Sequence, residues 1–130
     1  MSMEVALRAR LLAASAVAAA VGTRIDWTQR PQATALPAIV LQVVSDARPQ
    51  TMKALQEYRP TRVQIDVFAK TRGEAVTIRE AVIAALLPEA TQSGVSFRRA
   101  MIDSVRDLST NTDTGFVHRD SIDITLWHDA

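Results

Sequence analysis

Residues 63–87 read VQIDVFAKTRGEAVTIREAVIAALL, and this stretch joins a strand pattern to a helix pattern. At its start apolar and polar residues alternate, which is the period of a strand with one buried face. The alternation places Val63, Ile65 and Val67 on the inner face. The outer face takes the polar residues Arg62, Gln64 and Asp66. The stretch therefore begins as a strand that lies on a core.

The second part of the stretch has the signals of a helix start and a helix end. Thr71 and Glu74 form a capping box, Thr-x-x-Glu, which satisfies backbone N–H groups of the first turn. Apolar residues then recur at helical spacing at Ala75, Ile78, Val82 and Leu86. Pro88 follows directly after Leu87 and stops the helix. We therefore predict a capped helix that lies on the sheet.

Three further strands are predicted on either side of this stretch. The segment AIVLQVV is bounded by Pro37 and by Ser45-Asp46, and it places Ile39, Leu41 and Val43 on one face. Later in the chain we predict a third strand over Val95–Leu108, irregular near Arg98-Arg99, a polar hairpin tip over Ser109–Gly115, and a fourth strand over Phe116–His128.

The N-terminal segment favours a helix from Met3 to Ala20, because alanine and leucine are strong helix formers. Gly22 ends this helix. The apolar run from Leu11 to Val21 is much shorter than the roughly 20 residues that a membrane-spanning helix needs. After the helix we expect a polar loop over residues 26–37, which holds Trp27.

Together these elements give the order α-β-β-α-β-β. Runs of this kind fold as an α+β layer. We predict a four-stranded, largely antiparallel or mixed sheet with two helices packed on one face. At 130 residues the chain makes a single domain over 1–130.

Composition indicates an oligomer but names no partner. Hydrophobic residues make up 48% of the chain, but only 5% are aromatic, so large side chains for a core are scarce. We expect such a chain to complete its core against copies of itself. The formal charge of +1 does not favour sequence-independent binding of nucleic acid. The absence of cysteine excludes disulfides and thiolate metal sites.

The connection between the first two predicted strands, residues 45–60, is longer than a hairpin turn requires. We expect it to project from the domain. Met52, Leu55 and Tyr58 give it enough apolar surface to dock on a partner. Disorder is an equally good explanation from the sequence alone.

Candidate catalytic chemistry is sparse. There is no glycine-rich phosphate loop, nucleophile elbow or HExxH motif. His118 and Asp120 share one face of the last predicted strand and are the basis of a rival hypothesis, a small α+β enzyme or ligand-binding domain. Four further carboxylates could form an acid-base pair if strands aligned them: Asp66, Asp103, Asp107 and Asp123. Solvated polar residues on an exposed sheet face are the simpler interpretation.

Nucleic-acid binding by a basic groove is not predicted. Basic residues alternate with Phe97, Phe116 and Trp127, as stacking surfaces require. Acidic residues are equally dense in the same segments, so the charge nearly cancels.

Taken together, several of these segments resemble the tail-completion family, the tail terminators of long-tailed phages, prophages and gene transfer agents. The resemblance covers nearly the whole chain, and its most specific part is Ile65-Asp66-Val67-Phe68-Ala69 running into the capped helix. The closing segment FVHRDSIDITLWH also matches. The resemblance implies a fold similar to the tail terminator of phage lambda, and no enzymatic activity, catalytic residues, cofactor or metal.

What the resemblance implies is a structural virion assembly protein. Such proteins form a ring, usually a hexamer, that caps the tail tube, stops its polymerisation and joins it to the head connector or stopper protein. DNA passes through the ring without sequence-specific binding, no membrane is involved, and the ring assembles in the bacterial cytoplasm to lie at the head-tail junction of the virion. A head-tail connector or another tube-capping subunit of the same fold is the alternative.

If this interpretation holds, exposed loops make the contacts. The candidate contact residues lie in two segments, the long connection and the hairpin tip. They are Arg48, Lys53, Tyr58, Arg59, Thr110, Asn111, Thr112 and Asp113.

Overall fold

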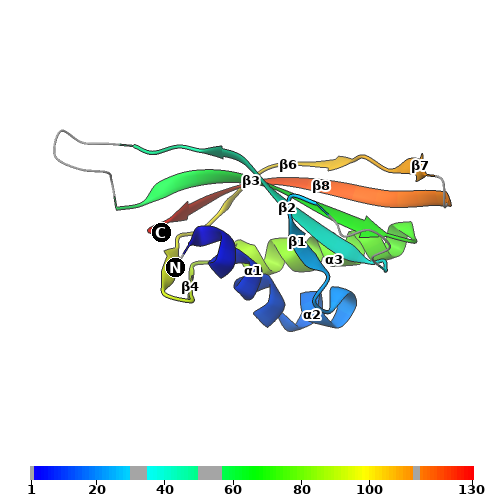
Figure 1. Ribbon diagram of the computed structural model, residues 1–130, viewed down its shortest axis with the longest axis horizontal. Helices are drawn as coiled ribbons and strands as arrows, with labels where there is room; N and C mark the ends of the chain where they lie inside the picture. The colour runs from blue at the N-terminus through cyan, green and yellow to red at the C-terminus, as the bar shows by residue number, and fades with distance from the viewer. Residues whose placement is uncertain (1, 30–34, 50–56, 113–114) are drawn as a thin grey trace.

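The computed structural model describes residues 2–29, 35–49, 57–112 and 115–130. Over these ranges the chain forms a mixed eight-stranded sheet with three helices on one face (Figure 1). The helices are α1 (Met3–Ala13), α2 (Ser15–Val21) and α3 (Arg72–Leu86). The strands are β1 (Ile25–Trp27), β2 (Ala38–Asp46), β3 (Arg59–Ala69), β4 (Ala90–Gln92), β5 (Val95–Phe97), β6 (Met101–Asp107), β7 (Thr110–Thr112) and β8 (Gly115–His128). The predicted α+β class is confirmed, but the four-stranded sheet with two helices is wrong in detail.

Four long strands form the centre of the sheet in the order β2, β3, β8, β6. Each neighbouring pair is antiparallel. β3 and β8 pair along their length, from Arg59 opposite His128 to Ala69 opposite His118. β1 lies parallel to β2 and makes the sheet mixed. β7 pairs with the start of β8, whereas β5, with β4 beside it, pairs with the end of β8.

The predicted alternation in β3 is confirmed. Val63, Ile65 and Val67 are fully buried beneath the helices. Their partners on β8 continue the same core, with Ile65 opposite Ile122 and Val63 opposite Ile124. Neighbouring apolar side chains on one face of two paired strands bury each other and the sheet face together. The core therefore lies between this face and the helices.

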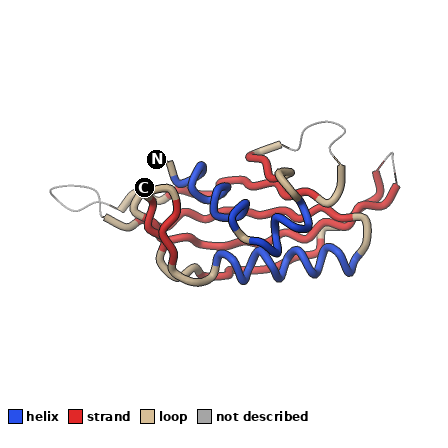
Figure 2. The backbone as a smooth tube through the Cα atoms, turned by 90° about the horizontal axis from the view of Figure 1, so that it is seen from below, coloured by secondary structure: helices blue, strands red, loops and turns tan. Residues whose placement is uncertain are grey.

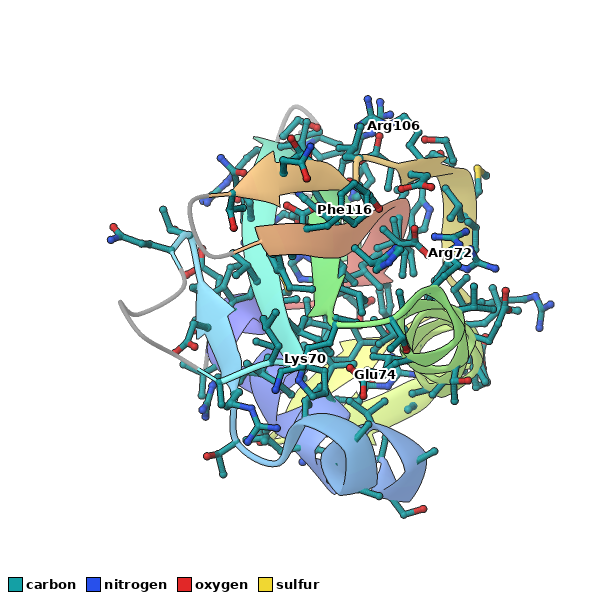
Figure 3. All side chains as sticks on the ribbon, turned by 90° about the vertical axis from the view of Figure 1, so that its right-hand side faces the viewer. Lys70, Arg72, Glu74, Arg106 and Phe116 are labelled. Atoms are coloured by element: carbon teal, nitrogen blue, oxygen red, sulfur yellow. The ribbon has the colours of Figure 1, made fainter. Side chains whose placement is uncertain are left out.

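The predicted capped helix corresponds to α3. The Thr71 hydroxyl accepts a hydrogen bond from the Glu74 backbone N–H at 3.2 Å. The Glu74 carboxylate accepts one from the backbone N–H of Lys70, one residue before the cap, and Figure 3 labels both residues at the start of α3. The helix turns its predicted apolar stripe, Ala75, Ile78, Val82 and Leu86, into the core. In Figure 2, which views the molecule from the helix side, α3 runs along the strands.

The predicted helix over Met3–Ala20 is in fact two helices. Ala14 has an extended backbone (ψ 111°) and separates α1 from α2. The local sequence does not mark this break, because alanine is the best helix former. After the break, Val17 and Val21 are fully buried in the common core. Tertiary packing therefore decides the break.

Three predictions about strands need correction. The expected polar loop over 26–37 begins within β1, where Asp26 and Trp27 pair with β2. The expected strand over Val95–Leu108 is divided into β5 and β6, which pair with different parts of β8. The expected hairpin tip includes β7, and β4 is a strand that was not predicted. All the missed strands have three residues, which is too short for a periodic signal.

The surface of the free subunit is ordinary in extent. Its 7075 Å² of accessible surface is close to the roughly 6,800 Å² expected for a compact monomer of this mass. The scarcity of large side chains therefore leaves no large excess of exposed area. No helix in the described part of the chain is long and apolar enough to cross a membrane.

Candidate assembly surfaces

Two of the predicted contact residues of the long connection bind the same carboxylate. Arg48 donates to Asp46 at 2.8 Å, and Arg59 donates to the other oxygen of the same carboxylate at 3.2 Å. Tyr58 lies under the guanidinium of Arg98, 4.5 Å from its carbon to the ring centroid. Lys53 lies outside the described residues. The ion pair between Arg59 and Asp46 therefore connects the start of β3 to the end of β2.

Asp46 also begins a hydrogen-bonded chain that reaches the end of β8. The Thr61 hydroxyl donates to Asp46 at 2.9 Å and lies 2.7 Å from Nε2 of His128. Burial alone would raise the pKa of Asp46, but hydrogen bonds from Thr61 and Arg48 hold that pKa below its ordinary value. Asp46 is therefore a charged anchor at this end of the sheet.

His128 is fully buried and neutral in this chain of contacts. Its Nδ1 accepts from the Ala130 backbone N–H at 3.2 Å. Because the Thr61 proton goes to Asp46, Nε2 of His128 must carry the ring proton and donate to Thr61. Burial lowers the pKa of His128, and the positive charge of Arg59 lowers it further. A second proton on the imidazole of His128 would sit on Nδ1, where it would point at the Ala130 backbone N–H and break this hydrogen bond.

The second group of predicted contact residues lies at the hairpin tip. Thr110, Asn111 and Thr112 form β7 and are all exposed. The Thr112 hydroxyl donates to the Gly115 carbonyl at 2.8 Å. Asp113 lies outside the described residues. Beside the tip, Phe116 is 52% exposed, so the tip offers both polar and apolar surface.

The two predicted groups lie at opposite ends of the sheet. Arg59 is at the end of the β3–β8 ladder where His128 pairs, and β7 lies beyond the other end, where Ala69 pairs with His118. β3 has 11 residues, so its two ends lie roughly 33 Å apart at about 3.3 Å per residue. Figure 1 shows the two ends at the left and right of the long axis. The structure therefore separates the contact residues into two surfaces.

The rival site at His118 and Asp120 has a structural explanation. Asp120 is 1% exposed and accepts hydrogen bonds from Arg72 and Arg79 of α3. His118 lies edge to face against the ring of Phe116, with centroids 4.9 Å apart. Among the described residues no three His, Cys, Asp or Glu side chains form a group that could hold a metal ion. Asp120 therefore ties α3 to β8.

The four other candidate carboxylates also have partners. Asp66 accepts from Arg119 at 2.8 Å and Asp123 from Arg62 at 3.0 Å. Asp103 accepts from the Thr125 hydroxyl at 2.7 Å. A hydrogen bond from the Ser109 hydroxyl lowers the pKa of Asp107. Each of the four carboxylates is therefore held by a hydrogen-bond donor of this chain rather than paired with a second carboxylate for acid-base chemistry.

Apart from Asp107, which lies beside Arg72 of α3, these carboxylates belong to a charged surface that sequence reasoning missed, the sheet face away from the helices, here called the open face. Its charged side chains come from β3, β6 and β8. They are Arg62, Asp66, Asp103, Arg106, Arg119 and Asp123. Figure 3 shows Arg106 on the side away from the helices and Arg72 beside α3. The alternation in RVQID and HRDSID was the available signal, but it could not show which charges would pair.

A second missed surface is an apolar groove beside α1. Val5, Ala9, Leu12 and Trp27 line it with Glu4 and Arg8, and its volume is about 340 Å³. The indole N–H of Trp27 donates to the Glu4 carbonyl at 3.0 Å. Arg8 donates to the Ile25 carbonyl at 2.7 Å and covers the outer edge of β1. The groove depends on β1, so it could not be predicted from a loop assignment.

Comparisons with known proteins agree with this fold. The family model described as tail completion protein gp17 matches residues 5–122. A chain from a solved virion of a native gene transfer agent particle has a TM-score of 0.76 at 17% identity, over 99% of this chain and 96% of that chain. A second solved structure has a TM-score of 0.64 at 16% identity, over 98% and 94%. None of the curated proteins matches. At these identities the two structures show a shared fold.

Proposed function

The chain belongs to the tail completion protein gp17 family, and we propose that it acts there as a ring-forming tail terminator. In this role a ring of copies, with six as the expected number, caps the tail tube and stops its polymerisation. The opposite side of the ring joins the head connector. The ring then lies at the head-tail junction of the virion, after assembly in the bacterial cytoplasm.

Family membership by itself shows that the chain is a structural protein of phage tails, which acts together with other structural proteins of the tail. Because the family is one of structural proteins, an enzymatic role is not expected. The residues that suggested one, His118 and Asp120, make a ring contact and two arginine pairs.

The main support for the terminator role is the separation of two chemically different ends. One end has Asp46 with Arg48 and Arg59, and the other has the neutral polar strand β7 beside Phe116. A terminator must bind the tube on one side and present a different surface on the other, so that no further tube ring adds. The two ends of the β3–β8 ladder differ chemically and so meet this requirement.

The distribution of exposed apolar residues supports a ring. Among the described residues, seven large hydrophobic side chains are exposed, and three of them lie on the outer strands β2 and β6 of the central sheet. They are Val5, Val44, Met101, Val105, Leu108, Phe116 and Trp127. Apolar side chains at sheet margins favour contacts with further chains.

The passage of DNA through the ring needs no specific binding, and the open face is consistent with this. Its three arginines lie beside carboxylates: Arg62 and Arg106 beside Asp123, and Arg119 beside Asp66. Binding of phosphates depends on cations that exchange counterions for the nucleic acid. Arginines already neutralised by carboxylates bind phosphate weakly.

The test is a tube-capping assay. Tail-tube protein is polymerised with and without this chain, and tube lengths and tube ends are measured by electron microscopy. We expect shorter tubes with a ring at one end, and native mass spectrometry of the chain on tubes to give one closed stoichiometry. Tubes of unchanged length and bare ends would contradict the proposal.

Variants at the two ends sharpen this assay. Arg48→Glu changes one end, and the double substitution Thr110→Lys and Thr112→Lys changes the other, at exposed positions. Addition of the head-connector protein gives the second readout. We expect one variant to lose tube capping and the other to lose connector binding. Loss of both functions in both variants would contradict a division between the ends.

A further inference from the structure

The central sheet has two open edges on its opposite sides. On one side, β1 pairs with β2 only as far as Leu41, so Gln42–Asp46 has β3 on its inner edge and no described strand on its outer edge. On the other side, β6 hydrogen-bonds to β8 and has no described strand on its outer edge. Unpaired N–H and C=O groups along such edges are ready to pair with another chain.

The strand directions decide how two copies can meet. β2 and β8 run in one direction, and β3 and β6 run in the other. A second copy, related by rotation about a ring axis, therefore places its β2 antiparallel to β6 of the first copy. The helices of both copies then stay on the same side of the joined sheet. An even number of central strands makes this continuation possible without turning a subunit over.

We infer that β6 of one copy pairs with residues 42–46 of β2 in the next copy, which joins the subunits of the ring through one continuous antiparallel sheet. This inference rests on the proposed function, because it requires a ring. The partner at each open edge is then another copy of this chain. The contact is heterologous, because it joins two different edges. The ring closes when the rotation between neighbouring copies is 360° divided by a whole number.

Exposed side chains at the two edges support this pairing. Val44 on β2 is 51% exposed, and Met101 and Val105 on β6 are 59% and 41% exposed. Pairing of the edges would place the side chains of a neighbouring strand next to Val44 and Met101, whereas Val105 is level with Leu41, just before residues 42–46. Burial of apolar surface and backbone hydrogen bonds would then act together.

Both edges are irregular at the same level of the sheet. β2 has a register shift between Val43 and Ser45, and β6 has one between Ile102 and Ser104. Through β3 and β8, Val43 and Ile102 are level with each other. Bulged edges pair poorly with arbitrary strands, so a matched partner is favoured.

The test is disulfide cross-linking, for which the cysteine-free chain is suited. Ser45→Cys is combined in turn with Met101→Cys, Ser104→Cys or Arg106→Cys. By register, all four positions lie on the open face, so the three combinations sample three alignments of β6 against β2. Disulfides form between β carbons roughly 4 Å apart, as in neighbouring strands. On assembled rings we expect one combination to give a ladder of covalent oligomers up to the full ring, reversed by reductant.

The matched control combines Ser45→Cys with Ala84→Cys, an exposed position on α3, and gives no ladder. Single variants also give none. A closed ring by native mass spectrometry without a ladder in any combination overturns the edge pairing but leaves the ring. Disulfide dimers from Ser104→Cys alone, and nothing larger from any combination, overturn it in favour of β6 with β6. A chain that stays monomeric even with tube protein overturns both the ring and this inference.

Discussion

The two faces of the sheet are built from alternate residues of the same strands, yet different forces hold them. On the helix side, Val63, Ile65 and Ile122 are fully buried, and removal of apolar surface from water stabilises them. On the open face, Arg62 and Arg119 bind carboxylates while remaining partly exposed. Ion pairs of this kind contribute roughly 0–1 kcal/mol. The helix side therefore determines the fold, and the open face has freedom to serve assembly.

The largest difference between the faces should appear on truncating neighbouring residues of β3. Ile65→Ala leaves a cavity in the core and should lower the free energy of unfolding by about 2–5 kcal/mol. The matched variant Gln64→Ala, on the open face, should cost about 1 kcal/mol or less. Chemical denaturation measures both. Equal losses would show that the two faces do not differ as described.

A polar group on the helix side gives the next largest effect. Asp120→Asn removes the charge that Arg72 and Arg79 share, and should cost about 1–3 kcal/mol because the partners are partly exposed. Asp107, which lies 3.7 Å from Arg72 and is 53% exposed, provides the control. Asp107→Asn should change the melting temperature much less. If Asp107→Asn lowers the melting temperature more than Asp120→Asn does, the main ion pair that holds α3 lies outside the core.

His128 tests the same face by pH. Its pKa in the folded chain is lowered by burial, so the unfolded chain binds the proton more readily. Stability is therefore complete above the ordinary value of about 6.5 and falls as the pH drops below it, by at most about 1.4 kcal/mol per pH unit. The free energy of unfolding is compared at pH 7.5 and 5.5. His128→Gln, which keeps a donor for Thr61, should reduce this loss, and an unchanged loss would assign it to other groups.

The smallest effect is expected on the open face. Ser121 is buried there, and its hydroxyl has no hydrogen-bond partner among the described residues. An unpaired buried hydroxyl has a desolvation cost, so Ser121→Ala should leave stability unchanged or raise it by up to about 1 kcal/mol. Thermal unfolding of the subunit measures the change. Clear destabilisation would show that this face also contributes to the fold through Ser121.

The sequence predicted those parts of the fold that depend on neighbouring residues. The alternation of β3 and the Thr71 cap with its apolar stripe follow from residues a few positions apart, and both are confirmed. The α+β class followed from the order of such elements. The division of the N-terminal helix at Ala14 and the three-residue strands were missed. Their conformations depend on packing and pairing with distant segments, which leave no local pattern.

For the candidate surfaces, the sequence by itself identified two exposed segments rich in polar residues, around Arg48 and around Thr110. Only the tertiary structure decided that they lie at opposite ends of one ladder. It also decided that Asp120 meets Arg72, 48 residues away, and that His128 meets Thr61, 67 residues away. The physical reason is that periodicity reports which face of an element is buried, whereas pairing register decides which residues of distant elements meet. The open edges of β2 and β6 arise from that register.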